Sequence, residues 1–315
     1  MTQAEQRALI TIALLAAHAD GLNDPAELAA VQQLAGRLSA PVDGSGAGID
    51  VATIEREVAG GKLALAEVVR PLSSPPLRQQ AYEAAVGIAG ADGAHTSTEA
   101  MFLAQLATAL GLAPDSTQGF AQQAGAIVAA PLPATSNAGA RPAPDEAALD
   151  QRILDAAVTN AALELLPESL ASIAIIPLQL KLVWRIGQAY GYELDQGHIK
   201  DFLATLGVGF AGQYLEQFGR KILGGLLGAI TGGIGRAIGN QAASSGMSFA
   251  TTWAIGQIAK QYYAGGRTLD PQKLKAAFAT LVTQAQTLSS RYAGDIAQRA
   301  RTLDIKNLPA LISQS

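Results

Sequence analysis

Apolar residues recur along most of this chain at spacings of three and four, which is the periodicity of one helix face. Leu103, Leu106 and Leu110 show this spacing in one stretch. Ala, Leu, Gln and Glu dominate, and runs in which β-branched residues alternate with polar ones are absent. The sequence therefore predicts an all-α protein.

Two segments interrupt the helical pattern. Residues 40–48 (APVDGSGAG) are typical of a long flexible loop, and residues 130–145 (APLPATSNAGARPAPD) contain four prolines without apolar periodicity. We interpret the second segment as a semi-stiff linker between domains. The predicted organisation is a pseudo-repeat helical bundle, a linker, a helical domain with a Gly-rich hairpin, and basic amphipathic helices: 1–130, 131–145, 146–266 and 267–315.

The composition narrows the class of protein. The 315 residues include 63 Ala and 33 Gly, and 49% are hydrophobic, which excludes a disordered chain. The absence of Cys excludes a disulfide scaffold, thiolate metal sites and Cys nucleophiles. No long basic run or interleaving of aromatic and basic residues is present, so we expect no nucleic-acid partner.

The first 130 residues contain an internal repeat, which appears when the sequence is shifted by 72 positions. Ala19-Asp20-Gly21 then falls on Ala91-Asp92-Gly93, and Glu27 falls on Glu99. Each copy predicts an apolar helix that ends at the Asp-Gly and a second helix that follows it.

The acidic residues at these two turns have two interpretations. Asp24 with Glu27, and Thr96 with Glu99, fit capping boxes at helix starts. Capping does not explain Asp20 and Asp92, because an anion at a helix C-terminus is disfavoured by the helix dipole. The alternative is a functional surface that binds a divalent metal or a basic partner.

The repeated A-D-G-x5-E spacing resembles the TerB-like domain of tellurite-resistance and related membrane-anchored co-chaperone proteins, over about residues 1–130. In that family the acidic residues at the helix turns are the suspected metal or partner site. The resemblance therefore implies a divalent-cation site at Asp20, Glu27, Asp92 and Glu99, with Asp24 and His95 as weaker ligands.

A Gly-rich stretch, ILGGLLGAITGGIGRAIG at residues 222–239, has its glycines in order on one helix face. They predict a helix-packing seam of the small-xxx-small kind: Gly224, Gly228, Gly232, Gly235 and Gly239. The apolar run before Arg236 is shorter than the roughly 20 residues that a spanning helix needs. A soluble Gly-packed bundle and a hairpin associated with lipid both remain open.

Residues 163–266 resemble a bacterial GTPase-associated domain of unknown function. The first motif has the form Q-x2-L-x3-I-x3-Y-G and the second G-x2-A-x2-Y-Y-x2-G. They fall on Gln179, Leu182, Ile186, Tyr190 and Gly191, and on Gly256, Ala259, Tyr262, Tyr263 and Gly266. Family members are fused to or paired with P-loop GTPases and stress-induced ATPases, often at the inner membrane. The resemblance implies such a partner in trans and no enzymatic activity.

Recognisable catalytic motifs are missing from the chain. Neither G-x4-G-K-[ST], G-x-S-x-G nor H-E-x-x-H occurs, so we expect no enzyme and no cofactor beyond a divalent cation. The predicted function is a membrane-associated adaptor of bacterial envelope stress, at the cytoplasmic face of the inner membrane or in the cytoplasm. The alternatives are a pore former whose Gly-rich hairpin inserts into lipid and a soluble metal-binding stress protein. A homo-oligomer is compatible with each.

The segment from Arg267 onward has an excess of basic residues and predicts an amphipathic helix from Pro271, with Leu274, Phe278, Leu281 and Leu288 on one side. Such a helix either docks on the bundle or lies on anionic lipid.

Overall fold

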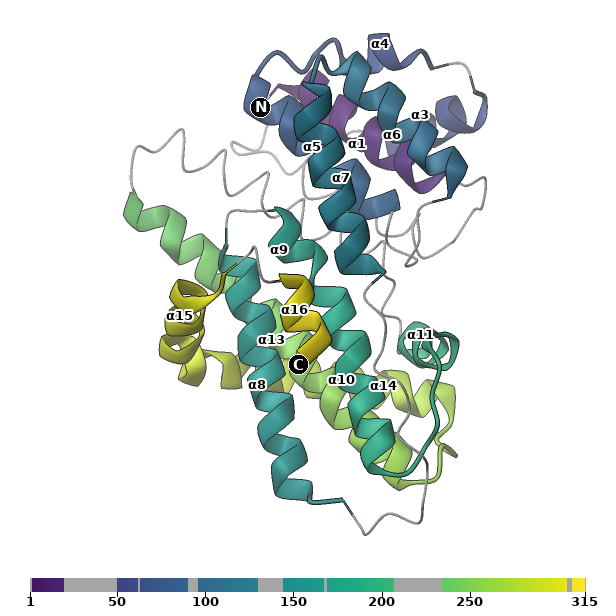
Figure 1. Ribbon diagram of the computed structural model, residues 1–315. Coiled ribbons are helices and arrows are strands. Elements are labelled where there is room, and N and C mark those ends of the chain that lie inside the picture. The colour runs from purple at the N-terminus through teal and green to yellow at the C-terminus, as the bar shows by residue number, and fades with distance from the viewer. Residues whose placement is uncertain are drawn as a thin grey trace. The chain divides into compact units, whose positions relative to one another are not determined.

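The computed structural model describes residues 2–19, 50–61, 63–89, 96–129, 144–166, 169–206, 234–304 and 308–314 (Figure 1). Every regular element in these ranges is a helix, which confirms the all-α prediction. The described residues up to 129 form one compact unit, and those from 144 onward form another.

The first unit consists of helices that each bury one side. They are α1 (Gln3–Ala17), α3 (Val51–Ala59), α4 (Leu65–Val69), α5 (Pro75–Ala89), α6 (Ser97–Ala109) and α7 (Pro114–Val128). Helix α1 packs against α3, α4, α5 and α6, and α5 also packs against α7. Ile10, Leu14 and Leu106 have no exposed surface. The core of this unit therefore lies around α1 and α5.

Helices α1 and α5 occupy equivalent positions in the sequence repeat. Each has 15 residues, and a shift of 72 carries the bounds of α1 onto those of α5. The two helices pack against each other. Helix α6 follows α5 in the second copy, while the matching residues of the first copy, 25–37, lie outside the described part of the chain. The matching bounds support the repeat found in the sequence.

The second unit is an independent helical bundle. Its elements are α8 (Glu146–Leu165), α9 (Ser169–Ile173), α10 (Ile175–Ala189), α11 (Gln196–Thr205), α13 (Ile234–Ala264), α14 (Pro271–Ser289), the short 3-10 helix η1 (Ser290–Tyr292), α15 (Ala293–Thr302) and α16 (Leu308–Gln314). Local sequence fixes several starts: Asp145 caps α8 by accepting from the Ala148 amide at 3.1 Å, and Asp270 caps α14 ahead of Pro271.

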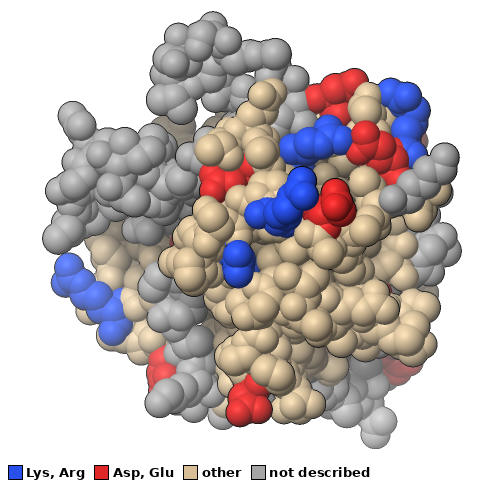
Figure 2. Space-filling view, turned by 90° about the horizontal axis from the view of Figure 1, so that it is seen from above, with Lys and Arg blue, Asp and Glu red and all other residues tan. Residues whose placement is uncertain are grey.

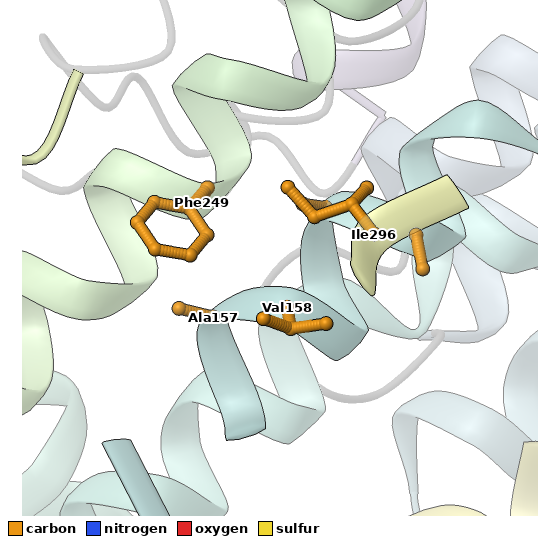
Figure 3. Packing of buried hydrophobic residues seen from close by; sticks show 6 residues of the cluster. Ala157, Val158, Phe249 and Ile296 are labelled. Atoms are coloured by element: carbon orange, nitrogen blue, oxygen red, sulfur yellow. The ribbon is translucent and has the colours of Figure 1, made fainter. Parts of the chain in front are cut away.

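Helix α13 is central to this bundle and packs against α8, α10 and α14. Phe249 of α13 has no exposed surface and faces Ala157 and Val158 of α8, with Ile296 of α15 nearby (Figure 3). The Phe249 ring also stacks on Tyr292, with ring centroids 5.7 Å apart. Small residues on α8 leave room for this large side chain, which is how a close-packed core is filled.

The segment Leu170–Ala189 is the one described helical stretch long and apolar enough to cross a membrane, with a mean hydropathy of 1.4. Within the unit, 89% of that window is buried. A core helix of a water-soluble bundle has the same length, hydropathy and burial.

The amphipathic helix predicted from Pro271 is α14. Leu274 is buried, Phe278, Leu281 and Leu288 are half-buried, and the helix packs along α13. Its apolar side is thus directed at protein in this structure.

Candidate functional sites

Most of the predicted acidic site lies outside the described residues. This holds for Asp20, Asp24, Glu27, Asp92 and His95. Glu99 is the one predicted ligand that the structure places. In the described part of the chain, no three His, Asp or Glu side chains gather in a way that could hold a metal ion. The divalent-cation site therefore stays a prediction.

Glu99 forms the capping box at the start of α6. The backbone amide of Glu99 donates to Thr96 Oγ1 at 3.2 Å, and the Thr96 amide donates to Glu99 Oε2 at 2.6 Å. The side chain is only 4% exposed. One carboxylate oxygen is thus committed to the helix start, as the capping interpretation predicts. Thr2 and Glu5 form the same box on α1, although the sequence analysis did not single them out.

The predicted glycine seam is described only at its end. Gly224, Gly228 and Gly232 lie outside the described residues, whereas Gly235 and Gly239 belong to the first turns of α13. Further along α13, a Cβ atom added at Gly256 would lie 2.6 Å from Ile153 Cγ2 on α8. The close helix approach that the structure shows is therefore at Gly256, a residue named above only as part of the second C-terminal motif.

The two C-terminal motifs meet in the second unit. Tyr192, just beyond the first motif, has its ring centroid 5.3 Å from that of Tyr263 in the second. A Cβ atom at Gly187 would lie 3.3 Å from the Tyr263 ring. The absence of a side chain at Gly187 thus leaves room for Leu194 and for the Tyr263 ring.

A cavity of about 170 Å³ borders this aromatic cluster. Its polar and aromatic lining includes His198, Asp201, Tyr262, Tyr263 and Arg267. The Arg267 guanidinium lies 5.8 Å from the Tyr192 ring centroid, which is cation–π distance. Burial raises the pKa of Tyr263 far above its usual range, so this phenol stays protonated. The cluster has the character of a packing site.

An ion network joins the start of α8 to α13 and α10. Lys260 Nζ lies 2.8 Å from Glu146 Oε2 and 2.7 Å from Asp150 Oδ1, and Tyr190 donates to Glu146 Oε1 at 2.6 Å. Hydrogen bonds from Lys260 and Tyr190 lower the pKa of Glu146. Burial together with Glu146 raises the pKa of Tyr190 to about 12. These shifts keep Glu146 ionised and Tyr190 protonated, so their hydrogen bond serves as a structural link.

A buried polar seam crosses the interface of α8, α10 and α13. The side-chain amides of Asn160 and Gln179 both donate to Thr252 Oγ1, at 3.0 and 3.1 Å. Asn160 and Thr252 have no exposed surface, and Gln179 is 1% exposed. Within the described structure, the amide oxygens of Asn160 and Gln179 accept no hydrogen bond. Gln179 belongs to the first C-terminal motif, whereas Asn160 and Thr252 could not be found from the sequence, because single polar residues within apolar helices leave no local pattern.

Charges of both signs lie side by side on the face of the molecule shown in Figure 2. Several Lys and Arg side chains there have Asp or Glu neighbours, and wide described areas carry no charge. In the first unit, Arg7 forms an ion pair with Glu57 at 2.5 Å. This face therefore does not carry a field of one sign.

Comparison with known proteins identifies the N-terminal part of the chain. Residues 6–122 match the family described as Tellurite resistance protein TerB. No curated protein matches the chain, and no solved structure matches it. The matched range begins within α1, ends within α7 and includes both copies of the repeat. Residues 6–122 are thus similar to the TerB family, and this match covers less than half of the chain.

Proposed function

We propose that this protein is a non-enzymatic adaptor of the bacterial stress response, related in role to tellurite resistance. The observation that carries the proposal is the TerB domain at residues 6–122, since this is a helical domain family without enzymatic activity. The second unit gives the adaptor a separate helical body with its own core. Two bodies on one chain suit a protein that links one partner to another.

The partner that we propose for the second unit is a P-loop GTPase or ATPase supplied in trans. The support is the resemblance of residues 163–266 to a GTPase-associated domain, together with the lack of a phosphate-binding loop in this sequence. The protein would act on the cytoplasmic face of the inner membrane.

The TerB domain would contribute a divalent-cation or partner site at its acidic turns. The repetition of Asp20 and Asp92 in register supports this, because capping does not require either residue. The acidic balance of residues 1–130, with 13 Asp and Glu against 6 Lys and Arg, favours the same class of ligand.

The adaptor function can be tested in cells that lack the gene. We expect loss of the gene to increase sensitivity to tellurite or envelope stress, and the full-length chain to restore resistance. Affinity capture of the full-length chain should recover a nucleotide-hydrolysing protein. Unchanged sensitivity together with capture of no such protein would contradict the proposal.

The acidic turns are tested by the double substitution Asp20→Asn with Asp92→Asn. We expect weaker binding of Mg²⁺, Ca²⁺ or Mn²⁺, or weaker partner capture, with the fold retained. If cation response, thermal stability and capture all stay at the wild-type level, these residues are local turn structure only. A rise in stability combined with lost capture would indicate a site maintained at a stability cost.

A further inference from the structure

A cavity of about 210 Å³ lies in the second unit among α8, α10, α15 and α16. Its charged lining, within the described residues, consists of four cations and one carboxylate: Arg152, Lys181, Arg185, Arg299 and Asp155. None of these residues belongs to the acidic turns or the Gly-rich seam. The cavity therefore calls for an explanation separate from the TerB domain.

Lys181 forms the deepest part of this positive lining. It is 2% exposed, and its ammonium group donates to the backbone carbonyl of Ile312 in α16. Burial and the nearby Arg185 guanidinium lower the pKa of Lys181 to about 8. Burial and Arg152 likewise lower the pKa of Arg185. Burial and a neighbouring guanidinium group thus disfavour the charged forms of both Lys181 and Arg185.

A comparison within the same unit shows what is unusual here. Lys260 also bridges helices, but it lies between two carboxylates, Glu146 and Asp150, and its pKa is raised. Lys181 instead faces other cations and a neutral carbonyl oxygen. Buried cations in proteins are ordinarily paired with anions, so a site with surplus positive charge fits an anionic ligand.

The remaining lining supplies polar anchors around these cations. Arg299 donates to Thr159 Oγ1 at 3.1 Å, which holds the guanidinium at the edge of the cavity. Asn160, fully buried on the cavity wall, has an amide oxygen without a hydrogen-bond partner in the described structure. This oxygen is an acceptor, so it would contact a water molecule or a protonated oxygen of a ligand and not the anionic oxygens themselves.

We propose that this cavity binds a compact, soluble anion that carries one or more phosphate groups, held by Arg152, Lys181, Arg185 and Arg299. Guanidinium groups match phosphate oxygens with paired, charge-assisted hydrogen bonds, and an ammonium adds a point charge. The volume is below the roughly 300 Å³ at which sites for drug-sized ligands begin, so the ligand is small. The proposal is independent of the adaptor function, because it rests on the geometry of the second unit alone.

The test is calorimetric titration of the full-length protein with pyrophosphate and with glycerol phosphate at low salt. We expect dissociation constants below about 1 mM for at least one of them. The double variant Arg152→Gln with Arg299→Gln should bind about tenfold or more weakly. Arg152 is exposed and Arg299 half-buried, so this variant is expected to fold, and circular dichroism checks that it does. Arg291→Gln, on the exposed η1 segment outside the cavity, is the matched control and should bind like wild type.

Three outcomes overturn the proposal. Neither anion binds at about 10 mM, where even a weak specific site would respond. Alternatively, both bind but the double variant and the Arg291→Gln control weaken equally, which indicates nonspecific charge attraction. Finally, vesicles of phosphatidylglycerol bind in a way that depends on Arg152 and Arg299 while the soluble anions do not, which assigns the phosphate to a lipid headgroup.

Discussion

At the scale of single residues, Gly256 sets how closely α13 approaches α8. An alanine there would place its methyl carbon 2.6 Å from Cγ2 of Ile153, well inside van der Waals contact. Ile153 is β-branched and has no exposed surface, so its side chain has little freedom to turn away. We expect Gly256→Ala to lower the free energy of unfolding by about 1–3 kcal/mol, measured by chemical denaturation.

Gly294 provides the control in the same unit, because a Cβ atom added there meets nothing within 4 Å. Gly294→Ala should leave stability unchanged or raise it by up to ~1 kcal/mol through helix propensity. Ile153→Ala removes both clashing Cγ atoms, so in that background the Gly256→Ala change should cost less than it does beside Ile153. Equal stabilities for Gly256→Ala and Gly294→Ala would show that the helices can separate at no cost.

Lys181 gives the second unit a pH dependence with a definite sign. Its pKa is about 8 in the folded protein and 10.5 when exposed, so the unfolded chain binds more protons between these values. The free energy of unfolding therefore rises with pH between these two values. Below pH 8, the cost of burying the charged Lys181 ammonium lowers it in full. The charged groups that line the same cavity are Arg152, Arg185, Arg299 and Asp155.

Replacing Lys181 with Met removes this titration. Relative to wild type, we expect the stability of Lys181→Met to fall by about 2 kcal/mol between about pH 7 and about pH 10, because wild type gains over that range. Denaturant titrations of both proteins at each pH measure the difference. A constant difference across the range would mean that Lys181 titrates normally.

At the scale of elements, two substitutions at the start of α6 can distinguish a capping role of Glu99 from a metal-binding role. Thr96→Ala removes the acceptor for the Glu99 amide and should cost about 1 kcal/mol. Glu99→Gln keeps an oxygen that accepts from the Thr96 amide, so stability should change by less than about 0.5 kcal/mol. It removes the charge that a divalent cation requires.

Thermal unfolding should therefore show a loss of stability for Thr96→Ala only. Cation titration should show weaker binding for Glu99→Gln only. Thr108→Ala, an exposed position near the other end of α6, controls for a general effect of changing a threonine. If Glu99→Gln binds divalent cations as tightly as wild type, Glu99 serves the helix start alone.

Elements are also where sequence reasoning succeeded most. The capping box, the repeat of α1 at α5 and the amphipathic α14 depend on residues a few positions apart, and local geometry alone produces their patterns. The positions of Asn160 and Thr252 could not be found in this way. They are 92 residues apart, and only the packing of α8 on α13 brings them together.

At the scale of the whole molecule, the main prediction concerns the membrane. The window within Leu170–Ala189 is 89% buried in its own unit, so crossing a bilayer would require that unit to open. We expect the protein in the membrane fraction to be released by a carbonate wash, as a peripheral adaptor would be. An integral protein of the same membrane serves as the control.

Retention after the wash would contradict peripheral binding and favour an inserted hairpin. Leakage of dye from liposomes on adding the protein would then support the pore-forming alternative. Recovery entirely in the soluble fraction would instead favour the soluble metal-binding alternative.

The sequence by itself determined the helical class and the repeat, because both follow from periodicity along the chain, and it carries the similarity of residues 6–122 to the TerB family. The tertiary structure decided which small residue permits a close helix crossing and which cations share a cavity. Gly256 meets Ile153, and Arg185 acts on Lys181 and is itself acted on by Arg152, through a fold that joins distant segments. Contact and electrostatic repulsion depend on distance in space, and separation along the chain carries no record of that distance.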